Sequence, residues 1–300
     1  MQKNYKTGEK SYMPIMFFLL ATFFWGINFH WAKYTIQSFS PFLASAIRFI
    51  VAGILVILHI LFFQKLNIHL LRERFFTFIF LGLTGGFLFN ICFFYGMKYT
   101  SPLNAAFIFA FSPLIISLLS FLSRQAKFSY GLLSGLVISL TGVLFILSKG
   151  NIQVLLTVSF NKGDILLFLS SLCFSIYSVV GNSIKKEGSS LINIFVTMCI
   201  SAILFTILAL NEMTVEVFKS ATVISWVSVL SMGVFASYVA YILWVEGIKR
   251  SGPTIASLFY NMVSFFTLII TMVIGEPVIL QQLIGGGLII AGVIINKVIK

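Results

Sequence analysis

The stretch from Gly96 to Phe109, GMKYTSPLNAAFIF, has a related copy that begins at Gly247, GIKRSGPTIASLFY. In both copies an apolar run ends in Gly-x-Lys, a short polar turn follows, and a proline opens the next apolar run. A proline fits the first turn of a helix because the N–H group there has no partner within the helix. Since the glycine, lysine, proline and alanine recur at one constant offset, the sequence indicates two copies of one larger unit, each with a helical hairpin near its middle.

The composition indicates that lipid surrounds the 300-residue chain. Hydrophobic residues make up 59% of it and charged residues 9%, which is too few charges to cover a water-soluble globule. The net charge of +12 does not indicate a nucleic-acid partner, because the basic residues stand in short turns between apolar runs. The cysteines lie inside apolar runs without a CxxC pattern or a histidine companion, so we expect no disulfide framework, no metal site and no cofactor.

Ten apolar runs divide the chain, and most are long enough to cross a hydrocarbon core as an α-helix. They lie near residues 13–32, 41–63, 75–97, 102–122, 129–148, 163–184, 190–210, 222–247, 253–274 and 277–297. Because the connections are short, the sequence predicts one all-α integral membrane domain with ten transmembrane helices. Five helices fall in each half, and since five is odd, the second half enters the membrane from the opposite face. We therefore expect two inverted five-helix repeats, an arrangement that recurs in secondary transporters.

The expected organisation is an N-terminal tail (1–12), a first repeat (13–148), a connecting loop (149–162) and a second repeat (163–300). Of the 20 Lys and Arg residues, fourteen fall on one side of the membrane and five on the other, with Arg48 inside a helix. The positive-inside rule then predicts that both termini are cytoplasmic. The first run has no small-residue cleavage pattern, so we interpret it as a retained helix and not as a signal peptide.

Several short motifs resemble those of a known family. They are Trp25-Gly26-x-Asn28, Arg48-Phe49, Gly142-Val143, Gly163-Asp164, Gly275-Glu276-Pro277 and Gly292-Val293. In order and spacing they resemble the drug/metabolite transporter superfamily, in its ten-helix branch built from two EamA-type repeats. The resemblance implies an exporter or exchanger of small metabolites, amino acids among them, in the cell (inner) membrane. It also implies a central cavity lined chiefly by helices 1, 3, 4, 6, 8 and 9.

Two positions depart from the pattern of this family. The acidic residue expected before the fifth helix is replaced around Arg124-Gln125. Pro113, inside the fourth helix, corresponds by offset to Ser264 in the ninth. Because a proline removes a backbone donor and crowds the preceding turn, we expect the fourth helix to kink and the ninth to stay straighter.

Charged residues in or beside the runs are candidates for gating or for tying helices together. Arg48 lies within the second run, where a charge costs free energy unless it is paired or faces water. Three roles are open to it: binding an anionic group of a substrate, snorkelling outward, or tying its helix to backbone carbonyls at helix ends. Glu246 precedes Lys249 and Arg250, which favours an ion pair over contact with a substrate. Asp164 and Glu276 stand at helix starts, where a carboxylate acts as a cap.

Amide and aromatic side chains within the runs are the candidates for lining a cavity, because amides need partners in the bundle and the aromatic residues join an apolar body to a polar tip. They are Trp25, Asn28, Asn90, Tyr95, Asn104, Tyr177, Tyr238, Tyr241, Trp244, Tyr260 and Asn261. Tyr238, Tyr241 and Trp244 recur every three residues and are therefore expected along one stripe of the eighth helix. Helix packing alone is the alternative explanation for such a stripe.

Two classes of function remain. The first is a secondary transporter (exporter, facilitator or exchanger) of small amphipathic metabolites such as amino acids, working by alternating access between the inverted repeats. Its variant is an exchanger of a larger metabolite such as S-adenosylmethionine or a nucleotide-like compound. The second class, an intramembrane enzyme acting on lipid, is disfavoured because no carboxylate or histidine suited to catalysis stands deep in any run. The expected partners are a small-molecule substrate and the bilayer, and the expected state is a monomer or weak homodimer.

Overall fold

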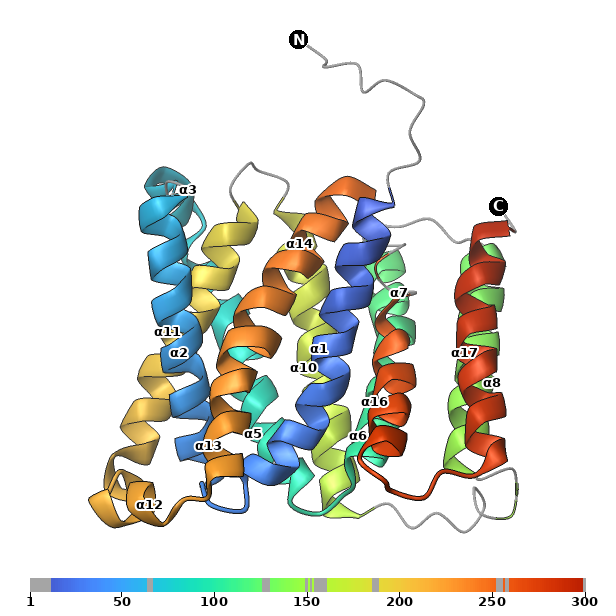
Figure 1. The fold of residues 1–300 in the computed structure, drawn as a ribbon. Coiled ribbons are helices and arrows are strands. Elements are labelled where there is room, and N and C mark those ends of the chain that lie inside the picture. Colours follow the sequence, from blue (N-terminus) through green and yellow to red (C-terminus); the bar gives the residue numbers. More distant parts are fainter. Residues whose placement is uncertain are drawn as a thin grey trace.

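The computed structural model is a bundle of upright helices (Figure 1). It describes residues 12–63, 67–125, 130–148, 151, 153, 161–184, 189–251, 256 and 259–298, and within these ranges there is no strand. Nearly all of the N-terminal tail and most of the connecting loop lie outside the described residues, as does Pro253 of the second repeated stretch.

The first half supplies five expected spans, some of them in several pieces. Its elements are α1 (Met13–Thr35), α2 (Pro41–Phe62), α3 (Ile68–Glu73), α4 (Phe75–Leu81), η1 (Gly82–Leu88), α5 (Phe89–Met97), α6 (Pro102–Phe109), α7 (Ser112–Leu122) and α8 (Tyr130–Leu147). α4, η1 and α5 form one continuous span, and α6 and α7 together make up the fourth. α2 starts at Pro41, as the sequence predicts. Ser40 caps the helix, because its hydroxyl oxygen accepts a hydrogen bond from the N–H of Leu43 at 3.1 Å.

The second half repeats this order. Its elements are α10 (Lys162–Ser183), α11 (Ser189–Ala209), η2 (Leu210–Glu212), α12 (Val215–Ser220), α13 (Val223–Ser231), η3 (Met232–Val239), α14 (Ala240–Ser251), α16 (Met262–Val273) and α17 (Leu280–Val298). Asn161 and Asp164 form a capping box at the start of α10: the N–H of Asp164 donates to Asn161 Oδ1 at 3.0 Å, and the N–H of Asn161 donates to Asp164 Oδ2 at 3.1 Å. The capping role expected for Asp164 is confirmed.

The all-α, multi-pass fold is confirmed. Six helices in the described ranges are long and apolar enough to cross a membrane, and four shorter apolar helices accompany them. In Figure 1 α1 begins at the upper end of the bundle, whereas α10 begins at the lower end. The second half therefore enters from the face opposite to the first, as an inverted repeat requires.

The two glycines that open the repeated stretches each pack against the first helix of the other half. A Cβ atom on Gly96 would lie 2.6 Å from Leu167 Cγ and 3.0 Å from the carbonyl oxygen of Gly163, both in α10. A Cβ atom on Gly247 would lie 2.5 Å from Cε1 of Phe18 in α1. The repeated sequence thus fixes the contact between the halves as well as a local turn.

α8 and α17, the last helices of the two halves, pack against each other at one side of the bundle (Figure 1). A Cβ atom on Gly142 would lie 2.5 Å from the carbonyl oxygen of Gly285. A Cβ atom on Gly292 would lie 2.5 Å from the carbonyl oxygen of Gly135. These glycines allow the backbones to approach, which is how helices associate closely in lipid.

The fourth and ninth helices are both interrupted at corresponding places. The break expected near Pro113 is confirmed, since a turn separates α6 from α7 directly before it. The expectation that the ninth helix stays straighter is wrong, because the chain also leaves the helix at Asn261, just before α16. A proline is therefore not required for the break. The hydroxyl of Ser264 donates to the carbonyl oxygen of Ala106 at 2.8 Å, which joins the two interrupted helices.

Two π-helical segments, η1 and η3, occupy matching places in the third and eighth helices. Gly82 of η1 and Gly233 of η3 are separated by the same number of residues as Gly96 and Gly247, so they occupy corresponding positions of the two repeats. Single π-helical turns are rare and often lie at functional sites. The sequence analysis did not predict them, although they determine much of the site described below.

We predict that Gly96→Ala destabilises the protein by about 1–3 kcal/mol, because the added methyl group overpacks the contact with α10. Gly53→Ala in α2 is the control, since a Cβ atom there would meet nothing within 4 Å and alanine favours a helix over glycine. The melting temperatures of the two purified variants in detergent provide the measurement. Equal melting temperatures would contradict the close approach at Gly96.

Candidate functional site

Aromatic side chains from both halves meet in the interior of the bundle. The ring of Trp25 on α1 lies 4.9 Å from that of Trp244 and 5.8 Å from those of Tyr241 and Tyr260, measured between centroids. Phe174 on α10 lies 5.9 Å from Trp25 and 5.1 Å from Tyr260. The rings form what we call the aromatic cluster: Trp25, Phe174, Tyr177, Tyr241, Trp244 and Tyr260. All six are buried.

Three of the predicted cavity residues lie apart from this cluster. The hydroxyl of Tyr238 is 3.0 Å from His59 Nδ1 on α2, so the expected single stripe of the eighth helix is wrong at this residue. The reason is that Tyr238 belongs to the π-helical η3, whose winding differs from the α-helical spacing on which the stripe was based. Tyr95 packs against Phe42, and Asn104 is exposed.

Two buried amides beside the aromatic cluster have an acceptor without a partner. Asn28 stands one helical turn after Trp25, and Asn261 directly follows Tyr260 at the interruption of the ninth helix. They are 7% and 1% exposed, and the Oδ1 atom of each has no hydrogen-bond donor in the part of the chain that the structure describes. Because a buried polar atom without a partner costs free energy, such atoms call for a specific explanation.

Arg48 points inward and is held by two other spans. Its side chain is only 3% exposed, so the snorkelling role is wrong. Its Nε donates to Ser237 Oγ in η3 at 2.6 Å, and its Nη1 donates to Asn90 Oδ1 in α5 at 3.2 Å. The arginine therefore does tie helices together, but through side-chain oxygens and not through backbone carbonyls at helix ends.

The π-helical segments connect Arg48 to the aromatic cluster. The indole N–H of Trp25 donates to the carbonyl oxygen of Ala236 at 3.0 Å, next to the serine that holds Arg48. In the other half, Nδ2 of Asn90 donates to the carbonyl oxygen of Gly86 in η1 at 2.8 Å. Tyr241 is close enough to Arg48 for an electrostatic interaction and also packs on Trp25. Arg48 and the cluster are thus parts of one polar and aromatic site.

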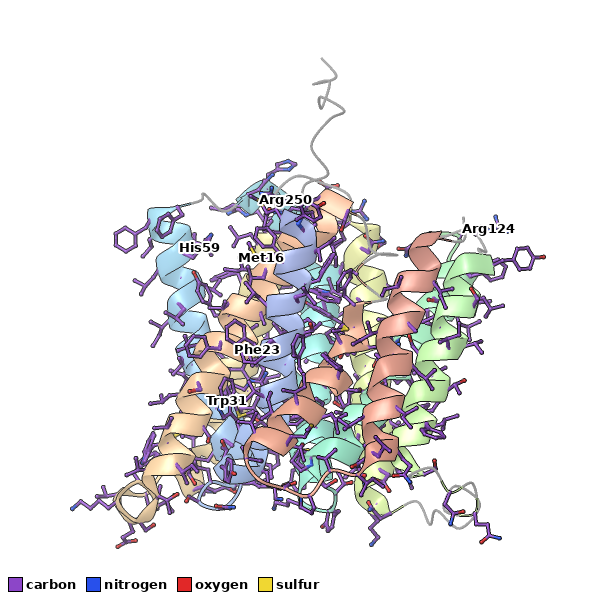
Figure 2. The ribbon with its side chains drawn as sticks, turned by 45° about the vertical axis from the view of Figure 1, so that its right-hand side comes forward. Met16, Phe23, Trp31, His59, Arg124 and Arg250 are labelled. Carbon is purple, nitrogen blue, oxygen red and sulfur yellow. The ribbon has the colours of Figure 1, made fainter. Side chains whose placement is uncertain are left out.

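Ion pairs lie away from this site. Glu246 pairs with Lys249 at 2.6 Å and with Arg250 at 3.7 Å, which confirms the ion pair expected there. Figure 2 shows Arg250 at the end of the bundle where α1 begins. Glu276 pairs with Lys33 of α1 at 3.7 Å, and because α17 starts several residues later, the expected capping role of Glu276 is wrong.

His30 lies in the last two turns of α1. It is buried within α1, and its Nε2 lies 3.2 Å from Thr271 Oγ1 and 3.4 Å from the carbonyl oxygen of Thr267. These neutral partners hold the ring between α1 and α16. Among the residues that the structure describes, no group of three or more His, Cys, Asp or Glu side chains is placed to hold a metal ion.

Comparison with known proteins identifies the family. The model of the EamA-like transporter family matches residues 12–148 and, a second time, residues 161–297. The chain belongs to the EamA-like transporter family. The resemblance inferred from the motifs is therefore confirmed, and this EamA-like protein is a multi-pass membrane transporter.

Individual relatives agree with this assignment. The chain is 32% identical over 271 residues to the uncharacterized transporter YyaM of Bacillus subtilis, with 90% of this chain and 89% of that protein covered. It is 24% identical over 257 residues to an S-adenosylmethionine/S-adenosylhomocysteine transporter of Chlamydia muridarum, with 84% and 80% covered. A crystal structure with 18% sequence identity has the same fold, with a TM-score of 0.74 over 95% of this chain and 96% of that one.

Two residues of the site in this EamA-like transporter were not predicted. The two family matches start at residues 12 and 161, and at this offset Trp25 in the first repeat corresponds to Phe174 in the second. The repeat could therefore have predicted that Phe174, like Trp25, lies in the site. Ser237 gave no signal, because a serine in an apolar run usually bonds to its own helix.

We predict that Trp25→Phe destabilises the protein by about 1–3 kcal/mol and lowers transport, because the carbonyl oxygen of Ala236 loses its buried donor. Trp226→Phe is the matched control. The indole of Trp226 donates to the carbonyl oxygen of Phe218 at 3.3 Å in a part-buried position, where losing a donor costs less than in the interior. Melting temperatures and solute exchange in proteoliposomes test both variants. A smaller loss for Trp25→Phe than for Trp226→Phe would contradict this view of the cluster.

Proposed function

We propose that this transporter is a secondary transporter of small amphipathic metabolites such as amino acids, acting as an exporter, facilitator or exchanger. The observation that carries the proposal is the aromatic cluster with the unpartnered oxygens of Asn28 and Asn261 beside it. Aromatic faces suit the apolar body of a solute, and the amide oxygens accept its N–H or O–H groups. The contact between Trp25 and Phe174 supports a site shared by the two repeats.

The proposed mechanism is alternating access, in which the two inverted repeats rock about this site. Lys33 belongs to the first repeat and Glu276 to the second, so their ion pair joins the halves at one end of the bundle. Its side chains are 46% and 44% exposed, and such exposed pairs contribute only about 0–1 kcal/mol. The pair can therefore open and close at little cost.

The proposed orientation follows from the charges of the loops. Both termini face the cytoplasm in the cell (inner) membrane, because fourteen Lys and Arg residues lie on that side and five on the other. In this proposal residues 1–12 are the cytoplasmic tail, 13–148 and 163–300 are the EamA-type repeats, and 149–162 connect them. The protein acts as a monomer or weak homodimer on a small molecule, and neither an enzymatic reaction nor a nucleic acid is involved.

A larger metabolite such as S-adenosylmethionine, or another nucleotide-like compound, is the second candidate. A purine ring would stack on aromatic faces such as those of Trp25 and Tyr260. The Chlamydia relative that is named as a transporter of S-adenosylmethionine and S-adenosylhomocysteine adds support.

Counterflow in proteoliposomes tests the proposal. Liposomes with the purified protein are loaded with one unlabelled compound from a panel of amino acids, nucleosides and S-adenosylmethionine, and entry of the same labelled compound is measured. We expect saturable exchange of at least one amphipathic compound, recovered chemically unaltered. Exchange no faster than in protein-free liposomes for every compound, or chemical conversion of the label, would contradict transport.

A further inference from the structure

The charge of Arg48 has no carboxylate partner within the described parts of the chain. Its two hydrogen-bonding partners there, Ser237 Oγ and Asn90 Oδ1, are both neutral. Removing a cation from water without an anion nearby carries a large desolvation cost. The interior of the bundle therefore holds a positive charge that the surrounding side chains orient but do not neutralise.

Asn90 is suited to orient Arg48 without neutralising it. Its Nδ2 donates to the carbonyl oxygen of Gly86, which fixes the amide so that Oδ1 faces Arg48 Nη1. An aspartate has nearly the same shape, yet at this position it would form an ion pair with the arginine. The asparagine thus leaves the charge of Arg48 available to another anion.

The chemistry of arginine indicates which anion fits. A guanidinium group presents a rigid fork of N–H donors that matches a carboxylate, and the two bonds to Ser237 and Asn90 leave further donors on the fork. Ser237, which accepts from Arg48, directly follows Ala236, which accepts the indole N–H of Trp25, so the arginine stands close to the aromatic cluster, where the apolar part of a solute would lie. A carboxylate at one end and an apolar or aromatic body at the other would suit the two parts of the site.

We propose that Arg48 binds the carboxylate of the transported metabolite while the aromatic cluster holds its body. This inference rests on the proposed transport function and adds the chemical group that is recognised. Amino acids and S-adenosylmethionine share this carboxylate, so either can be the solute. Their decarboxylated counterparts lack the group and are poor ligands.

Pairs of competitors in the counterflow assay test the inference on the wild type. The pairs are L-phenylalanine with phenethylamine, L-leucine with 3-methylbutylamine, and S-adenosylmethionine with its decarboxylated form. We expect that, within each pair that interacts with the protein, the carboxylate compound inhibits exchange at a concentration lower by about tenfold or more, which corresponds to about 1.4 kcal/mol. Equal inhibition by the amine would overturn the inference without the use of any variant.

Asn90→Asp tests the role of the free charge. The new carboxylate pairs with Arg48, keeps the tie between α2 and α5, and competes with the carboxylate of the solute. We expect the concentration of the carboxylate compound needed for half-maximal exchange to rise by about tenfold or more. The melting temperature should fall somewhat, because the carboxylate cannot replace the donor that Asn90 Nδ2 gives to the carbonyl oxygen of Gly86. An unchanged concentration would overturn the inference.

Asn67→Asp is the matched control, because it makes the same chemical change on the surface. Asn67 Oδ1 caps α3 by accepting the N–H of Leu70 at 3.0 Å, and aspartate caps equally well. This variant should exchange like the wild type. Arg48→Lys keeps the positive charge but loses the planar set of N–H donors. Unlike Asn90→Asp it adds no negative charge to the site, and it should still weaken carboxylate recognition.

The outcomes separate the two proposals. If the wild type exchanges no compound of the panel, the transport proposal itself fails. If it exchanges only amines or nucleosides, transport stands and the assignment of a carboxylate to Arg48 is wrong.

Discussion

The structure depends on the cost of placing the Arg48 guanidinium inside a bundle of membrane-spanning helices. A buried arginine needs hydrogen-bond acceptors from neighbouring helices at its own depth. Ser237 and Asn90 supply them from the eighth and third helices, one from each half of the chain. The position of this one side chain thus couples α2 to both spans that carry a π-helical segment.

The repeated sequence explains how two halves of opposite orientation fit together. Gly96 allows α10 to approach closely, and Gly247 allows α1 to approach closely. Corresponding glycines of the two repeats therefore serve the same purpose. The first helices of the repeats then meet through Trp25 and Phe174, at the aromatic cluster. A site formed in this way contains residues of both repeats, so the rocking of the repeats that we propose would change access to it.

The fold could be predicted because its causes are regular. Apolar runs of sufficient length, prolines at helix starts and the constant offset of the repeat predicted the helical spans and their inverted order. The interior was harder to predict, since one π-helical turn alters which side chains share a face. For this reason Tyr241 and Trp244 join the aromatic cluster while Tyr238 contacts His59.

The sequence predicted which polar side chains are buried, but it did not predict their hydrogen-bond partners. The sequence marked Asn28, Asn261 and Arg48 as costly in lipid, but it could not show which of them find partners, because those partners come from distant parts of the chain. Ser237 is separated from Arg48 by most of the protein, and nothing in its local sequence sets it apart. The break at Asn261 likewise occurs without a proline.

In the proposed mechanism the interior site is reached in turn from each side of the membrane. The most direct measurement is labelling of Asn261→Cys by a membrane-impermeant thiol reagent, in a background where Cys92, Cys173 and Cys199 are replaced by alanine. Asn261 is 1% exposed in this structure, so labelling requires an opening motion. We predict labelling from the cytoplasmic side and from the opposite side in vesicles of defined orientation, slowed on both sides by a transported solute. Labelling from one side only, whether or not a solute is present, would contradict alternating access at this site.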